Sequence, residues 1–179
     1  LLGIARRRPD GIELRVYPAM VGIDTPIASV EGVFNAVVAD GDQVDQVMMV
    51  GRGAGEGPTA SAVIADLVDV ARGFRAPILG LPASDLPALT VLPPETHRGA
   101  FYVRLMVVDQ PGVIADIAAL MRDHEVSIEG FLQRGRSPND AVPVVMTTHE
   151  TEEGRLLAAL EAIGRLPTVL EPPHMIRVE

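Results

Sequence analysis

The pattern of hydrophobic and polar residues predicts strands and a hairpin near the start of the chain. Between residues 12 and 16, hydrophobic side chains alternate with Glu13 and Arg15, which is the period of a strand with its hydrophobic face buried. Two more apolar runs, 33–39 and 44–50, flank an Asp-Gly-Asp sequence. Because an Asp-Gly pair between β-prone runs is typical of a tight turn, we expect these two runs to form a hairpin.

A helix is predicted to begin near Pro58. Proline is favoured in the first turn, because an N–H group there would have no hydrogen-bond partner within the helix. Val63, Leu67 and Val70 fall on one stripe of this helix, with other apolar residues beside it. That width predicts a helix buried over much of its circumference. Residues 74–98 contain a proline every few positions but keep hydrophobic side chains, so we expect an ordered, extended linker laid against a surface.

The final 80 residues alternate between strand and helix patterns in the order βαββαβ, which is the ferredoxin-like arrangement. In chain order we expect a strand at 101–108, a helix from Val113, a strand at 127–133, a polar loop at 134–140, a strand at 142–148, a helix capped by Thr151 and ended by Gly164, and a strand at 174–178. We interpret the acidic cluster Glu150, Glu152 and Glu153 as the solvated start of the second helix. The fold class is therefore α+β, with a domain boundary near Gly99.

The composition narrows the chemistry that this chain can perform. All fifteen basic residues are arginine, so lysine-dependent mechanisms are excluded within the chain. It contains no cysteine, which excludes disulfides and thiolate chemistry. A net charge of −9 with four Phe, two Tyr and no Trp argues against a nucleic-acid partner. No apolar run approaches the roughly 20 residues that span a membrane. The apolar segment at Leu1 lacks the features of a signal peptide, so we expect a piece of a longer polypeptide.

A glycine-rich turn, with the sequence GRGAGEGPT at residues 51–59, joins the predicted hairpin to the predicted helix. Glycines let a backbone approach a ligand closely, and free N–H groups at a helix start attract anions. The third glycine of the dinucleotide fingerprint is absent, and Glu56 places a negative charge where a phosphate would lie. From spacing alone, ligand contact and a purely structural turn remain equal alternatives.

A second strand-to-helix turn, Asp-Gln-Pro-Gly at 109–112, offers N–H groups for a carboxylate and Asp109 for an ammonium group. From the sequence alone the plainer interpretation is a Pro-Gly turn with Asp109 as a helix cap. The four histidines, His97, His124, His149 and His174, lack the spacing of a metal site, and we expect them at the surface or at strand edges. No metal and no catalytic group is predicted in this chain.

Several stretches of the chain resemble homoserine dehydrogenase. They are the sequence IDTPIASVEGVFNAV at 23–37, the glycine-rich turn, and the sequence PTASAV at 58–63. The opening sequence LLGIA resembles the family segment just after the catalytic lysine. Residues 100–179, with Pro-Gly-Val at 111–113 and Ser-Ile at 127–128, resemble the ACT regulatory domain that bacterial members of the family carry.

The resemblance implies how the chain is organised. Residues 1–73 would be the rear part of a mixed-sheet domain for substrate binding and dimerisation, here incomplete. Residues 74–98 would be the proline-rich linker, and residues 99–179 the ferredoxin-like ACT domain. The Rossmann domain and the catalytic lysine would precede Leu1, so the chain alone would be inactive and would hold no cofactor. Thr25 stands where many members of the family have histidine, which puts any role of that histidine in doubt here.

The function implied is the NAD- or NADP-dependent interconversion of L-aspartate 4-semialdehyde and L-homoserine, in threonine and methionine biosynthesis in the cytoplasm. The residues implied to border the cofactor are Gly51, Gly53, Ala54, Gly55 and Thr59. The residues expected to bind a small amino-acid effector, threonine first, at the interface of a homodimer are Asp109, Gly112, Val113, Ile114 and Ser127. The alternatives are a stand-alone ACT-type amino-acid sensor, which would have no need of the glycine-rich turn, and a purely structural dimerisation fragment.

Overall fold

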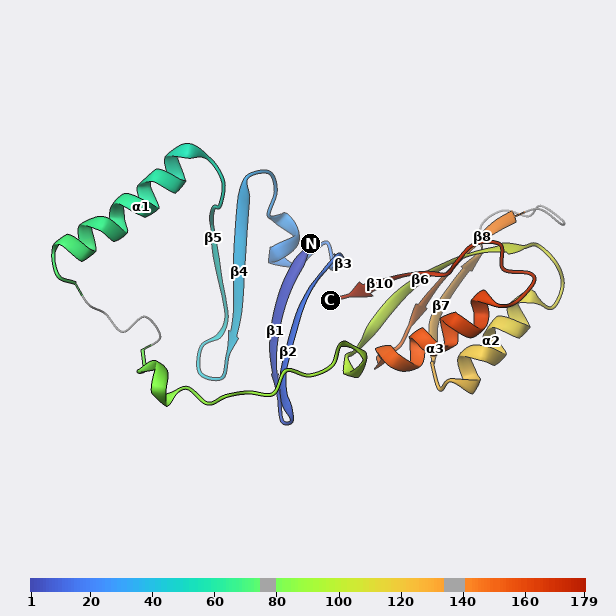
Figure 1. The fold of residues 1–179 in the computed structure, drawn as a ribbon. Helices are drawn as coiled ribbons and strands as arrows, with labels where there is room; N and C mark the ends of the chain where they lie inside the picture. Colours follow the sequence, from blue (N-terminus) through green and yellow to red (C-terminus); the bar gives the residue numbers. More distant parts are fainter. Residues whose placement is uncertain (75–79, 134–140) are drawn as a thin grey trace. The chain divides into compact units, whose positions relative to one another are not determined.

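The computed structural model describes residues 1–74, 80–133 and 141–179. These residues divide into two compact units, one formed by Leu1–Met20 together with Leu89–Glu179, and the other by Val21–Ala88. Figure 1 shows the elements of both. The polar loop expected at 134–140 lies outside the described residues, as does part of the linker, residues 75–79.

A mixed sheet with two helices forms most of the first unit. In order across the sheet, its strands are β3 (Ala19–Met20), β10 (His174–Val178), β6 (Arg98–Val108), β8 (Ala141–Thr148) and β7 (Ile128–Gln133). The helices are α2 (Val113–Asp123) and α3 (Glu153–Gly164). Without β3, the order is fourth, first, third and second strand, which confirms the predicted ferredoxin-like fold. The parallel pairing of β3 with β10 extends this sheet and was not predicted.

The hydrophobic core of this unit lies between the sheet and the helices. Alternate residues of β6 and β8 point into it, because successive side chains of a strand face opposite ways. Helix α2 contributes Val113, Ile117 and Met121, which lie on one stripe at helical spacing. Phe101, Leu105 and Leu156 are among the side chains with no exposed area. About 25 cal/mol for each Å² of buried apolar area makes this packing the main source of stability.

The start of α3 differs from the prediction. Thr151 is not the helix cap, because it lies in the short strand β9 (Thr151–Glu152), where it pairs with Gly99 of β6. Glu152 occupies the cap position without a side-chain cap bond. The N–H of Glu153 instead donates to the carbonyl oxygen of His97, at 2.7 Å. Glu153 is therefore buried, with 3% of its surface exposed, and is not part of a solvated helix start.

Before this domain, β1 (Leu2–Arg8) and β2 (Gly11–Tyr17) form an antiparallel hairpin. Strand β2 contains the predicted alternation, but its burial is the reverse of what we expected. Leu14 and Val16 are 52% and 76% exposed, whereas Glu13 on the polar face is 3% exposed. The hydrophobic face finds no covering surface among the described residues, and the polar face packs within the unit.

The linker after residue 88 packs on β2, as we expected of an ordered linker. The N–H of Ile12 donates to Thr90 and the N–H of Leu92 donates to Ile12, at 2.8 and 2.9 Å. A Cβ on Gly11 would lie 2.3 Å from the carbonyl oxygen of Thr90, so this close approach requires glycine. The short 3-10 helix η3 (Pro94–Thr96) then leads into β6.

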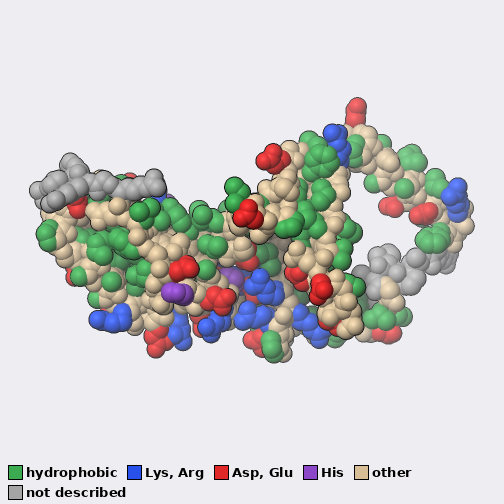
Figure 2. All heavy atoms as spheres, turned by 180° about the vertical axis from the view of Figure 1, so that it is seen from behind, with side chains coloured by type: hydrophobic (Ala, Val, Ile, Leu, Met, Phe, Trp, Pro, Cys, Tyr) green, Lys and Arg blue, Asp and Glu red, His purple; other side chains and the backbone are tan. Residues whose placement is uncertain are grey.

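The second unit contains the predicted hairpin, formed by β4 (Phe34–Gly41) and β5 (Asp45–Arg52), and the helix α1 (Glu56–Ala71). Two 3-10 helices, η1 (Pro26–Ser29) and η2 (Ala83–Asp85), complete it. The expected burial of α1 is wrong for this chain, because none of its residues is buried. Figure 2 shows hydrophobic side chains at the surface of this unit. No described helix is long and apolar enough to cross a membrane.

Candidate functional site

The glycine-rich turn links the end of β5 to the start of α1. Gly51 pairs with Asn35 in the hairpin, and the N–H of Gly53 donates to the carbonyl oxygen of Val33, at 3.3 Å. A Cβ on Gly53 would lie 2.1 Å from Nδ2 of Asn35, so no larger residue fits without displacing that side chain. The turn is thus held by its own hairpin.

The helix start within this turn is shaped by backbone alone. Gly55 is the N-cap of α1, with φ at 115°, a conformation that L side chains rarely adopt. The N–H of Thr59 donates to the carbonyl oxygen of Gly55, at 3.2 Å, so Thr59 lies in the first helical turn. The residues implied to border the cofactor all lie within this turn and are exposed in this chain: Gly51, Gly53, Ala54, Gly55 and Thr59.

The second predicted site lies where β6 ends and α2 begins. Gly112 is the N-cap of α2, with φ at 97°, and Val113 is buried directly after it. Ile114 is partly buried against the core. Asp109 is partly buried and accepts a hydrogen bond from the side-chain amide of Gln133, at 3.1 Å. Four of the five expected effector residues therefore lie together at one end of the sheet.

Ser127, the fifth expected effector residue, lies at the other end. It immediately precedes β7, whereas Gln133, which contacts Asp109, ends that strand. Helix α2 separates Gly112 from the approach to Ser127, and its 11 residues rise about 1.5 Å each, or about 16 Å. Ser127 contacts His149 instead, through a 3.2 Å approach of Oγ to Nδ1 and a 3.0 Å hydrogen bond from the N–H of His149 to the Ser127 carbonyl oxygen.

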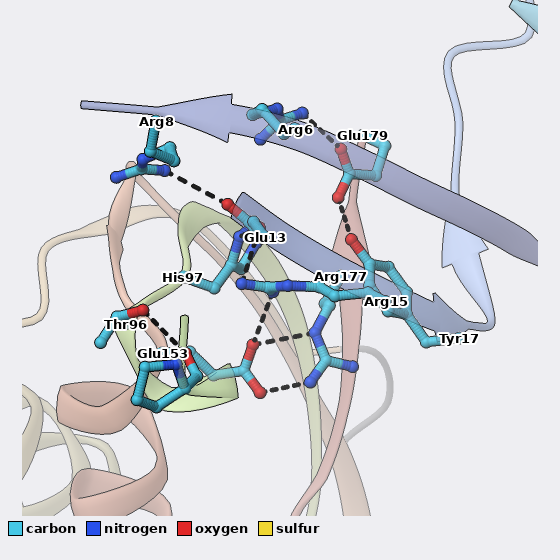
Figure 3. Close-up of polar contacts among 11 residues, drawn as sticks. Arg6, Arg8, Glu13, Arg15, Tyr17, Thr96, His97, Glu153, Arg177 and Glu179 are labelled. Carbon is cyan, nitrogen blue, oxygen red and sulfur yellow. Dashed lines mark hydrogen bonds and ion pairs between the residues drawn. The ribbon is translucent and has the colours of Figure 1, made fainter. Parts of the chain in front are cut away.

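A cluster of charged side chains, which the sequence did not lead us to expect, lies between the polar face of β2 and the start of α3 (Figure 3). The carboxylate of Glu13 lies 2.6 Å from Nη2 of Arg15 and 2.8 Å from Nδ1 of His97. Glu153 accepts a hydrogen bond from Nε of Arg177 at 2.9 Å and a second from its Nη2. Arg15 also approaches Glu153, with Nη1 3.5 Å from Oε2.

The surroundings of this cluster shift two pKa values. Burial lowers the pKa of His97 below its ordinary 6.5, and the positive charge of Arg15 lowers it further, although Glu13 acts in the opposite sense. Burial raises the pKa of Tyr17 to about 12, helped by the hydrogen bond that its hydroxyl donates to Glu179. His97 is 1% exposed, so its expected place at the surface is wrong. The other three histidines are partly or fully exposed, and no group of metal-binding side chains occurs among the described residues.

Comparison with known proteins agrees with the two halves of this architecture. Residues 1–68 match the family model described as homoserine dehydrogenase, and residues 101–168 match that of the ACT domain. A homoserine dehydrogenase of Neisseria gonorrhoeae is 39% identical over 100% of this chain and 42% of its own length. One of Pseudomonas aeruginosa is 40% identical over 99% of this chain and 43% of its own length. The crystal structure of a homoserine dehydrogenase from Thiobacillus denitrificans is similar, with a TM-score of 0.88, 40% identity and coverage of 99% of this chain and 41% of the other.

The fold and these matches first define a class, an oxidoreductase portion joined to an ACT domain. The chain belongs to the homoserine dehydrogenase family and corresponds to the C-terminal portion of its members. It spans about two fifths of the length of the curated relatives that it matches. A stand-alone sensor is less well supported, because the dehydrogenase match includes the hairpin and the glycine-rich turn.

Proposed function

We propose that this chain serves an enzyme that interconverts L-aspartate 4-semialdehyde and L-homoserine with NAD or NADP, in threonine and methionine biosynthesis in the cytoplasm. The observation that carries the proposal is the glycine-rich turn, which lies inside the segment that matches the dehydrogenase family. In this proposal the catalytic lysine comes from another part of the enzyme, because this chain contains none. Its own contribution is one wall of the active site and a regulatory domain.

The turn suits the nicotinamide end of the cofactor better than its phosphates. The stretch from Gly51 to Gly55 presents backbone with almost no side chain, which a flat ring can approach closely. Glu56 in the first turn of α1 would repel a phosphate. When bound, the cofactor supplies or accepts the hydride, while the residues of this turn orient its ring and limit the access of water.

Two alanine substitutions in the full-length enzyme test this role. Gly53→Ala places a Cβ 2.1 Å from Nδ2 of Asn35 and displaces that side chain beside the turn, so we expect the KM for the cofactor to rise at least tenfold. Gly57→Ala is the matched control, because a Cβ there meets nothing within 4 Å and alanine favours a helix. An unchanged KM in Gly53→Ala, with the protein folded, would contradict the role of the turn. The chain of residues 1–179 alone should show no dehydrogenase activity.

We further propose that the regulatory site forms only when two copies of the ACT domain pair side by side. Strand β7 ends the order of the sheet, and an unpaired edge is a template for another strand. If two β7 strands pair antiparallel about a two-fold axis, the start of one lies beside the end of the other. Ser127 of one protomer would then approach Asp109 and Gly112 of its partner, which explains why the structure holds them apart within one chain.

Such a site suits a small amino acid. The N–H groups at the start of α2 would bind the carboxylate, Asp109 would bind the ammonium group, and Ser127 of the other protomer would contact the side chain. Threonine, an end product of the proposed pathway, is the first ligand to test, followed by methionine, isoleucine and serine. Micromolar to millimolar binding corresponds to about −8 to −4 kcal/mol and is measurable by calorimetry.

Mixing two variants that bind threonine weakly tests whether the site is shared between protomers. Asp109→Asn and Ser127→Ala should each weaken threonine binding at least tenfold as homodimers. A mixed dimer of the two variants contains one site with both native residues, so about half of the sites should bind with the native Kd. If both residues acted within one protomer, the mixed dimer would recover no binding, and the proposal would fail. Sedimentation should show a dimer in each preparation.

A further inference from the structure

The feature that carries the inference is Arg15, a buried arginine placed between two carboxylates from different parts of the unit. Glu13 lies on the same strand, whereas Glu153 begins α3 of the ACT domain. The side chains of Glu13 and Glu153 are each 4% exposed, and that of Arg15 is 6% exposed. Figure 3 shows the guanidinium of Arg15 between the two carboxylates. It therefore bridges β2, which lies in the dehydrogenase match, and α3, which lies in the ACT match.

This bridge is not fully satisfied. Nε, Nη1 and Nη2 of Arg15 are all buried, and none of them makes an aligned hydrogen bond within the described residues. Glu153 is already held by two bonds from Arg177, and Glu13 is shared with His97. A buried charge with incomplete partners costs free energy, so a small movement of either carboxylate changes which one Arg15 prefers. In this structure Arg15 lies closer to Glu13, at 2.6 Å, than to Glu153, at 3.5 Å, so the second carboxylate offers it an alternative partner.

The ACT side of the bridge connects to the proposed effector site. Ser127 is tied to His149 through a backbone hydrogen bond and a contact between their side chains. From His149 the chain passes through β9 to Glu153 within four residues. A ligand that moves Ser127 thus moves a short, hydrogen-bonded segment that ends at the carboxylate facing Arg15.

The dehydrogenase side leads toward the catalytic segment. Strand β2 is paired along its whole length with β1, from Gly11 opposite Arg8 to Tyr17 opposite Leu2. A shift of Arg15 along β2 is therefore transmitted to the start of β1, because paired strands move together. By the proposed function, the residues immediately before Leu2 lead to the catalytic lysine.

We propose that Arg15 couples the effector site to the catalytic domain by exchanging between Glu13 and Glu153. Effector binding at Ser127 moves Glu153, Arg15 follows or releases it, and the hairpin β1–β2 transmits the change. The coupling rests on the proposed function, because it needs both an amino-acid effector and a dehydrogenase. Arg15 and Glu153 are here positioning residues and contact neither substrate nor effector.

The experiment uses the full-length enzyme that contains this chain. The coupling is the ratio of the Kd of threonine with and without saturating homoserine and cofactor, and typical couplings are about 5- to 150-fold. In Glu153→Gln we expect this ratio to move at least threefold toward one, while the Kd of threonine in the free enzyme stays within twofold. Glu161→Gln is the matched control, because Glu161 also lies on α3 and pairs with an arginine, Arg165, but is exposed. Its ratio should be that of the native enzyme.

The possible outcomes separate this proposal from the one on which it rests. A native ratio in a folded Glu153→Gln enzyme overturns the role of Arg15. If Glu153→Gln does not fold, Glu13→Gln decides by the same criterion from the other side of the bridge. If the native enzyme binds threonine but homoserine does not change its Kd, the effector site stands and the coupling is overturned. If the native enzyme is active but binds none of the four amino acids, the effector proposal fails and the coupling fails with it.

Discussion

Acidification should destabilise the chain through His97. Because the folded state lowers the pKa of this histidine, it stays neutral there, whereas in the unfolded chain it takes up a proton near its ordinary pKa of 6.5. The unfolded state therefore binds more protons below pH 6.5, and the free energy of unfolding falls as the pH falls. Well above pH 6.5 the histidine is neutral in both states, so this loss of stability is absent there. The free energy of unfolding should therefore be lower at pH 5.5 than at pH 7.5.

Urea unfolding followed by circular dichroism at the two pH values measures this loss. Carboxylates of the same cluster also titrate on the acid side, so the comparison is with His97→Gln, which cannot take up a proton at this position. We expect the loss to be smaller in His97→Gln than in the native chain. His174→Gln, at an exposed position, should keep the native loss. Equal losses in the native chain and in His97→Gln would refute the reasoning.

Three further substitutions test the packing and the charges of the same unit by urea unfolding. Gly99→Ala would place a Cβ 2.7 Å from Nε2 of His97, whose ring packs edge-on against Phe101. Overpacking should therefore cost about 1–3 kcal/mol, and an unchanged free energy of unfolding would show that the ring can move. Leu156→Ala removes a side chain with no exposed area and should cost about 2–5 kcal/mol, and a loss below 1 would contradict the assigned core. Glu13→Ala leaves Arg15 and His97 without their shared carboxylate and should cost about 3–5 kcal/mol, whereas a loss typical of an exposed ion pair, below about 1, would show that the cluster is solvated.

The ACT domain was predictable because its local signals and its packing agree. The stripe of α2 is the face that the structure buries, and the hydrophobic runs of β6 and β8 supply the opposite side of the core. In the second unit, the Asp-Gly pair predicted the hairpin of β4 and β5, in which Asp45, the first residue of β5 after the turn, has φ at 54°. Such signals depend only on residues close together in the sequence, so a single sequence is enough to predict these elements.

The charged cluster was not predictable, because its members come from four distant segments. Glu13, His97, Glu153 and Arg177 are separated by at least twenty residues each, and none has a neighbour in sequence that marks it as buried. An acidic residue at a helix start is usually solvated, and only the carbonyl oxygen of His97 beside the N–H of Glu153 makes this one different. No periodicity carries that information. In this cluster, local rules fail where the two family segments meet.

The alternation in β2 predicts a buried hydrophobic face, whereas the structure buries the polar face. Both of its faces need a partner, but only the ACT side lies within the described residues. Leu14 and Val16 form a hydrophobic face that is exposed here, as is the stripe of α1 around Leu67. By the proposed function, such exposed stripes with a regular period are where another domain of the enzyme would pack. The polar face of β2, with Glu13 and Arg15 inward, meets the ACT domain through the charged cluster. The proposed coupling depends on this choice of residues, because a buried arginine offered two carboxylates can exchange between them, whereas a hydrophobic contact has no alternative partner of that kind.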